Sequence, residues 1–259
     1  MMKKGFGHTA SVLYDAALAL LYPQPCAVCG MSVESRSDGV ACALCWQKTR
    51  LFTEEDLICW KCGLLGRGRV PEEQREEVRC RRCEAEPYSQ ARACGLYEGA
   101  LRASVLALKR EPHVAARLAR HLLETQRRAP LNRATRIIPV PLHPERLRAR
   151  GYNQAAILAR TLAKLSGLPD DDGSLARTVH TERHRAGMDE RARRESVENV
   201  FQVRRPRLVE NESILLIDDV FTTGATASSC ARALVNAGAR EVLVLTVARP
   251  AQMSDTRWW

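Results

Sequence analysis

Aromatic side chains are scarce in this sequence of 259 residues, at 5% of positions. That scarcity argues against a protein that holds single-stranded nucleic acid mainly by stacking bases on exposed rings, so phosphate contacts would have to hold such a ligand. Two nucleotide-binding signatures are also missing. The sequence contains no Gly-x-Gly-x-x-Gly motif and no Gly-Lys-Ser/Thr loop, which excludes the dinucleotide fingerprint and the Walker loop.

A long apolar run is missing as well. The longest apolar stretch, residues 11–22, is interrupted by Asp15 and is shorter than the roughly 20 residues that a helix needs to cross a bilayer. Lys3 and Lys4 precede it, as in a signal peptide, but no small-residue cleavage pattern comes before Pro23. We therefore expect an amphipathic helix over residues 11–22, no membrane span and a location in the cytoplasm.

Positive charge is abundant. Lys and Arg number 40 against 30 Asp and Glu, which gives a formal net charge of +10. Residues 102–150 hold twelve of these cations and only three acids, so a polyanion such as nucleic acid is a candidate partner. The alternative is a basic face that is merely solvated. With 45% hydrophobic residues the chain can bury a core, and its length favours two domains.

Cysteine spacing predicts metal binding. Eight of the ten cysteines form four Cys-x-x-Cys pairs in the first third of the chain. Two thiolates on one tight turn can both reach a zinc ion at about 2.3 Å, and two such turns complete a tetrahedral site. Gaps of 12 and 17 residues between successive pairs predict two zinc ribbons in tandem, each with a structural zinc ion. The predicted ligands are Cys26, Cys29, Cys42 and Cys45 for one ion, and Cys59, Cys62, Cys80 and Cys83 for the other.

Three alternatives stay open for these cysteines: a disulfide framework, a redox role for one pair, and interleaved pairing of the motifs. The remaining Cys94 and Cys230 stand alone among apolar residues and are expected in the core. The composition changes near residues 84–90. We therefore expect an N-terminal helix and double zinc ribbon over residues 1–88, and a second domain with its own core over residues 89–259.

The clearest strand of the chain leads into an anion-binding turn. Residues 214–217 are four consecutive aliphatic residues, as in a strand of a parallel sheet that helices cover on both faces. Two carboxylates follow, then a turn of small residues, then an expected helix over 225–236. A helix N-terminus at the carboxyl end of a strand attracts phosphate, and a glycine in the turn allows close approach of the backbone. The candidate residues are Asp218, Asp219, Thr222, Thr223, Gly224, Ala225 and Thr226.

A second candidate segment lies over residues 137–154. Two prolines stiffen the loop after the Ile137 and Ile138 strand, and Arg146 and Arg150 are four residues apart, so both can face one anion. The alternative is a connecting loop with solvated arginines.

Residues 214–226 resemble the phosphoribosyl pyrophosphate motif of type I phosphoribosyltransferases. The resemblance implies that Asp218 and Asp219 hold the ribose hydroxyls and that the turn at 222–226 binds the 5-phosphate, with Mg²⁺ accompanying the pyrophosphate. It also implies a mostly parallel sheet flanked by helices, an α/β fold. Purine salvage enzymes of this fold have an aspartate at the position of Thr222, so the sequence identifies no catalytic residue and leaves enzymatic activity open.

Further segments resemble the ComF-like family, in which an N-terminal zinc ribbon precedes such a domain. They are residues 97–110, the run Ile-Pro-Val-Pro-Leu at 138–142 with the arginines and Gly-Tyr-Asn-Gln that follow it, and a mobile-loop motif between residues 176 and 203. Arg185 and Ser196 depart from the family pattern. The resemblance implies a protein of competence, natural transformation and DNA uptake that binds phosphoribosyl pyrophosphate and single-stranded DNA, with DNA-processing proteins as partners. The alternatives are an active phosphoribosyltransferase of nucleotide metabolism and a structural adaptor with a vestigial site.

Overall fold

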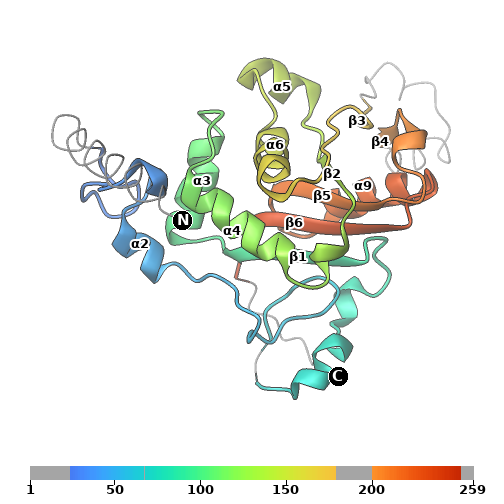
Figure 1. The fold of residues 1–259 in the computed structure, drawn as a ribbon, viewed down its shortest axis with the longest axis horizontal. Helices are drawn as coiled ribbons and strands as arrows, with labels where there is room; N and C mark the ends of the chain where they lie inside the picture. The colour runs from blue at the N-terminus through green and yellow to red at the C-terminus, as the bar shows by residue number, and fades with distance from the viewer. Residues whose placement is uncertain (1–23, 67, 179–199, 252–259) are drawn as a thin grey trace, which may run out of the picture.

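A four-stranded parallel sheet forms the centre of the protein (Figure 1). The computed structural model describes residues 24–66, 68–178 and 200–251. The strand order is β1-β6-β5-β2, and all neighbouring pairs are parallel. The strands are β1 (Gln90–Leu96), β2 (Arg136–Pro139), β5 (Ser213–Val220) and β6 (Glu241–Arg249), while β3 (Leu175–Arg177) and β4 (Phe201–Val203) form a separate antiparallel pair. The expected parallel sheet is confirmed.

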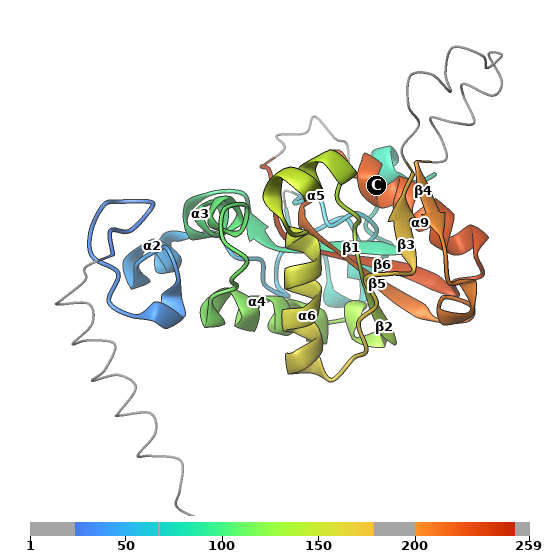
Figure 2. The same cartoon turned by 90° about the horizontal axis from the view of Figure 1, so that it is seen from above.

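Helices cover both faces of this sheet, as Figures 1 and 2 show. Along β5, Leu215 and Ile217 belong to one buried cluster and Ile214 and Leu216 to the other, because successive side chains of a strand point to opposite faces. The first cluster includes side chains of α3 (Gly99–Leu108), α4 (Ala116–Arg127) and α6 (Gln154–Ser166), and the second includes those of α9 (Ala225–Asn236). The shorter helices are α2 (Ala43–Lys48), α5 (Pro144–Arg150) and the 3-10 turns Arg36–Asp38, Glu72–Glu77, Arg81–Cys83, Leu131–Arg133 and Pro206–Leu208.

The two cysteine-rich segments belong to different buried clusters. Cys26, Cys42, Cys45 and Trp46 lie in the cluster with α3 and α4, whereas Cys59, Cys62, Cys80 and Cys83 lie in the cluster with α9. Thr49 fastens the first segment to the sheet domain, because its Oγ1 accepts a hydrogen bond from the backbone N–H of Ala100 at 2.9 Å. Each cysteine-rich segment therefore adds side chains to a buried cluster that is built mainly from the sheet and its helices. The boundary at residues 88 and 89 stays a prediction.

Other local expectations agree with the structure. The strand at 214–217 lies within β5, the helix over 225–236 is α9, and Cys94 and Cys230 are buried. Within the described ranges no helix combines the length and the apolar character needed to span a membrane. The expected helix over residues 11–22, Arg185 and Ser196 lie outside the described residues.

Candidate metal centres and anion site

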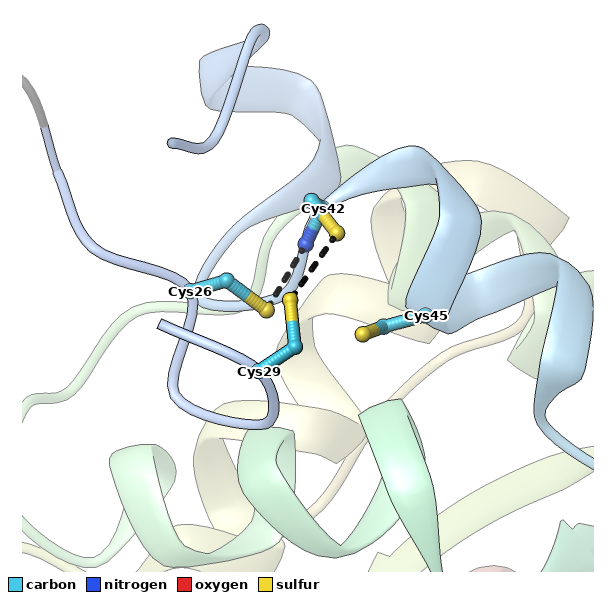
Figure 3. A group of neighbouring side chains, drawn as sticks. All are labelled: Cys26, Cys29, Cys42 and Cys45. Atoms are coloured by element: carbon cyan, nitrogen blue, oxygen red, sulfur yellow. Dashed lines mark hydrogen bonds between the residues drawn. The ribbon is translucent and has the colours of Figure 1, made fainter. Parts of the chain in front are cut away.

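The first four-cysteine group, formed by Cys26, Cys29, Cys42 and Cys45, has the geometry of a tetrahedral metal site (Figure 3). Its four sulfur atoms lie within 4.8 Å of one another, and the Sγ atoms of Cys29 and Cys42 are 3.7 Å apart. Tetrahedral zinc with bonds of about 2.3 Å requires sulfur atoms about 3.8 Å apart. Burial opposes ionisation of Cys26, but N–H groups that include those of Cys42 and Val28, at 3.3 and 3.4 Å from its Sγ, lower its pKa to about 6. The group can therefore supply the thiolate that a metal needs.

The second four-cysteine group, formed by Cys59, Cys62, Cys80 and Cys83, is buried at all four positions. Its Sγ–Sγ distances are 3.5 Å for Cys59 and Cys83, 3.5 Å for Cys62 and Cys80, and 3.4 Å for Cys80 and Cys83. These distances suit tetrahedral zinc and are far longer than the roughly 2.05 Å of a disulfide. All ten cysteines are free, and consecutive motifs form each group, so the tandem pairing is confirmed and the disulfide and interleaved alternatives are not supported.

A cavity of about 540 Å³ lies at the carboxyl end of β5. It brings together side chains from both candidate segments of the sequence, on three elements: Asp218 and Asp219 from β5, Thr226 from α9, and Arg146 and Arg150 from α5. Gly151 ends α5 in the left-handed conformation, with φ of 80°, and the side chain of Asn153 caps α6 by accepting from the N–H of Ala155 at 3.1 Å. The end of α5 and the capped start of α6 thus fix the position of the helix whose arginines line the cavity with the acidic pair.

The acidic pair has two direct partners. Lys109 Nζ lies 3.6 Å and Gln154 Nε2 3.5 Å from Asp219 Oδ2, while the N–H of Asp219 donates to Asp218 Oδ1 at 2.8 Å. Burial and the neighbouring Asp219 carboxylate raise the pKa of Asp218 from 3.8 to about 7. A ligand that offers hydroxyl donors or positive charge to this pair would favour its ionised form.

The turn after β5 exposes the start of α9 to solvent. Gly224 is the N-cap, with φ of 85°, and Thr223 Oγ1 accepts from the N–H of Ala225 at 3.3 Å. Thr222, Thr223, Ala225 and Thr226 are exposed, and Thr226 is the member of the turn that lines the cavity. Because the first N–H groups of a helix lack intrahelical partners, this exposed end can accept an anion.

Three further cavity residues were not identified as site residues from the sequence. Lys109 caps α3, Arg177 ends β3 and Gln154 begins α6. Gln154 lies in the candidate segment 137–154 and Lys109 in the basic span, but nothing in the sequence places either of them, or Arg177, beside the acidic pair. Only the strand order places them beside the end of β5.

Comparison with known proteins agrees with this architecture. The model of the phosphoribosyl transferase domain family matches residues 147–257, which include the acidic pair and the turn. Together with the parallel sheet, this match defines a type I phosphoribosyltransferase fold that also carries two four-cysteine groups.

Similarity to individual named proteins identifies the family more narrowly. The DNA utilization protein YhgH of Salmonella typhi is 30% identical over 241 residues, which cover 89% of this chain and 99% of that protein. Competence protein F of Haemophilus influenzae is 35% identical over 117 residues, 44% of this chain and 49% of that protein. Competence protein ComFC of Bacillus subtilis is 32% identical over 102 residues, 39% of each chain. The chain belongs to the ComF-like family.

Zinc content is the direct test of the two four-cysteine groups. We expect two zinc ions per chain, one for each group, and one ion after either Cys29→Ser or Cys59→Ser. Because Cys59 is buried and Cys29 is exposed, Cys59→Ser should lower the melting temperature more. Elemental analysis and calorimetry measure both effects. Protein without zinc, or with these cysteines in disulfides by thiol titration, would contradict the assignment.

The pKa of Asp218 predicts a pH-dependent stability. The folded protein keeps a proton on Asp218 up to a pH of about 7, whereas the unfolded chain releases it near 3.8, so this group lowers the free energy of unfolding as the pH rises through that window. Asparagine cannot ionise. Without ligand, the melting temperature of Asp218→Asn relative to the parent should therefore increase from about pH 4.5 to about pH 7.5 and then level off. The exposed Asp172→Asn is the control. A difference that does not change with pH contradicts the raised pKa.

Proposed function

We propose that this protein acts in DNA uptake and natural transformation, and that its phosphoribosyltransferase-fold domain binds phosphoribosyl pyrophosphate and single-stranded DNA. The observation that carries the proposal is the cavity at the end of β5. It combines a carboxylate pair, four cationic side chains and the exposed N-terminus of α9. The names of the relatives, DNA utilization protein and competence protein, support the biological setting.

The charge of the cavity suits a ligand with phosphate groups on a sugar. Lys109, Arg146, Arg150 and Arg177 line it against the two carboxylates. In the proposed complex Asp218 and Asp219 accept from the ribose hydroxyls, the turn at 222–226 binds the 5-phosphate, and the cationic side chains face the pyrophosphate with its Mg²⁺. These contacts would be the same for a ligand that is only bound and for a substrate that reacts.

The basic span of residues 102–150 is the proposed DNA-binding region. Some of its cations interact with other parts of the protein, and others are exposed. Arg117 pairs with Asp38 at 3.0 Å, and Arg128 donates to the Phe52 carbonyl oxygen at 2.8 Å. Through these contacts the two arginines connect α4 and the residue after it to the first cysteine-rich segment and to the start of the second. Exposed cations remain on α3, α4 and α5 and the loop after α3: Arg102, Arg110, Arg120, Arg127, Arg146 and Arg148. The second set supports phosphate contacts to a strand, with little base stacking.

An active phosphoribosyltransferase is the second candidate, and the fold itself favours it. Phosphoribosyl transfer requires that the sugar gain cationic character as pyrophosphate leaves, while a nucleophile is held in line. Release of pyrophosphate in the presence of a panel of nucleobases would distinguish transfer from simple binding. DNA-processing partners and a location in the cytoplasm stay predictions from the sequence.

Replacement of the acidic pair tests the sugar site. We expect the double variant Asp218→Ala, Asp219→Ala to bind phosphoribosyl pyrophosphate at least about tenfold more weakly, because hydrogen bonds to charged groups contribute roughly 1.5–3 kcal/mol each. Thr223→Val should also weaken binding, through the phosphate. Titration calorimetry with and without Mg²⁺ measures these changes, with Asp172→Ala as the control. Equal affinity of the double variant and the parent would rule out this site.

Salt dependence tests the DNA site. Arg120 and Arg127 are exposed and lie two turns apart on α4, so they share one face of the helix. We expect Arg120→Ser, Arg127→Ser to weaken binding of single-stranded DNA and to flatten the slope of log affinity against log salt by about 0.7 for each lost phosphate contact. Fluorescence anisotropy at several salt concentrations measures the slope.

The control removes the same charge elsewhere. Arg207 and Arg232 are exposed outside the basic span, and Arg207→Ser, Arg232→Ser should keep the parent's slope. If both double variants lose affinity equally, the strand is attracted by net charge alone and the proposed surface is wrong.

A further inference from the structure

Two arginines flank the second four-cysteine group, Arg249 buried and Arg92 partly buried. Arg92 Nη1 donates to the Trp60 carbonyl oxygen at 2.8 Å, and Arg249 Nη1 donates to the Cys62 carbonyl oxygen at 2.6 Å. Zinc held by four thiolates would carry a net charge of about −2, which two nearby guanidinium groups would offset. The arginines therefore stabilise the metal group and fasten its first turn to β1 and β6.

Only one of the two arginines reaches the anion turn. The guanidinium carbon of Arg249 lies 5.3 Å from the ring centroid of Phe221, the residue that follows β5. That of Arg92 lies instead over Trp60, at 4.8 Å. Phe221 is also fixed by an edge-on contact with Tyr88, with ring centroids 5.9 Å apart, and belongs to the same buried cluster as the four cysteines.

The ring of Phe221 packs against the backbone of the turn. A Cβ atom on Gly224 would lie 2.8 Å from Cζ of Phe221, so the ring sits directly against the backbone of the helix N-cap. The hydroxyl of Ser228, in the first turn of α9, also hydrogen bonds to the carboxylate of Glu86, three residues after Cys83. The segment that follows the metal group thus contacts α9 through Glu86 and the residue before the anion turn through Tyr88.

We propose that the second four-cysteine group, through Arg249 and Phe221, positions the backbone of the turn at 221–226 for its anion. The first four-cysteine group belongs to the other buried cluster, so the contacts through Arg249 and Phe221 do not include it. The inference rests on the proposed function for its ligand, and makes Arg249 and Phe221 positioning residues for phosphate binding. Loss of the second metal should therefore weaken ligand binding at a turn that contains no metal ligand.

Arg249→Met and Arg92→Met form a matched pair of variants. Each removes one guanidinium and one hydrogen bond to the same cysteine turn, and only Arg249→Met removes the contact with Phe221. We expect both to lower the melting temperature. Only Arg249→Met should weaken the affinity for phosphoribosyl pyrophosphate, by about tenfold, and speed hydrogen exchange of the peptide that covers residues 221–228. Arg249→Lys, which keeps the charge, should recover most of the affinity.

Phe221→Leu keeps the site apolar and decides the matter if Arg249→Met does not fold. It should reproduce the loss of affinity and the faster exchange while the zinc content stays at the parent's value. Parent-like affinity and exchange in Arg249→Met or Phe221→Leu would overturn the inference, as would an equal loss of affinity in Arg92→Met.

The exchange experiment needs no ligand, so it separates this inference from the proposed function. If the parent protein binds no phosphoribosyl pyrophosphate, the proposed function fails. Faster exchange at 221–228 in Arg249→Met, with parent-like exchange in Arg92→Met, would then still support the coupling, and parent-like exchange in both would overturn it.

Discussion

The parallel pairing of β5 with its neighbours β6 and β2 is the constraint on which the candidate site depends. Carboxyl ends of parallel strands meet at one edge of a sheet, and the register places Asp218 beside Thr246 and Val220 beside Ala248. The chain leaves β5 at Phe221, whose N–H donates to the Ala248 carbonyl oxygen at 2.9 Å. The same edge of the sheet, where the parallel strands end, therefore carries the acidic pair, the anion turn and Arg249 at the end of β6.

Charged side chains lie in two different regions on either side of that edge. On the side of α5 and α6, cationic side chains face a carboxylate pair across an open cavity. On the side of the second four-cysteine group, Arg92 and Arg249 donate to carbonyl oxygens of the turn that holds Cys59 and Cys62. Phe221 lies between these regions, and its packing gives a physical route by which the metal group contributes to the shape of the turn.

Local signals predicted a large part of this structure. The spacing of the Cys-x-x-Cys motifs identified both four-cysteine groups because a tetrahedral site needs only two tight turns and a short connection. Strand β5, the glycine turn and α9 were predicted because a continuous aliphatic run, a small-residue turn and a helix follow one another directly. In both cases the residues that interact are close in sequence.

What the sequence did not predict depends on contacts between distant segments. Lys109 meets Asp219 only because α3 ends at the same edge of the sheet as β5. Arg249 meets Cys62 across most of the chain length, and neither residue's neighbourhood indicates the other. The packing of the two four-cysteine groups in different buried clusters was also unexpected, because a tandem repeat gives no information on where each copy packs.

A crystal structure of the zinc-loaded protein with phosphoribosyl pyrophosphate and Mg²⁺ would show where the ligand binds. We expect density for the 5-phosphate at the N–H groups of residues 222–226, with the ribose hydroxyls on Asp218 and Asp219 and the pyrophosphate toward Arg146 and Arg150. Density for the ligand elsewhere on the protein, or a cavity at the end of β5 that stays free of ligand at saturating concentration, would contradict this expectation.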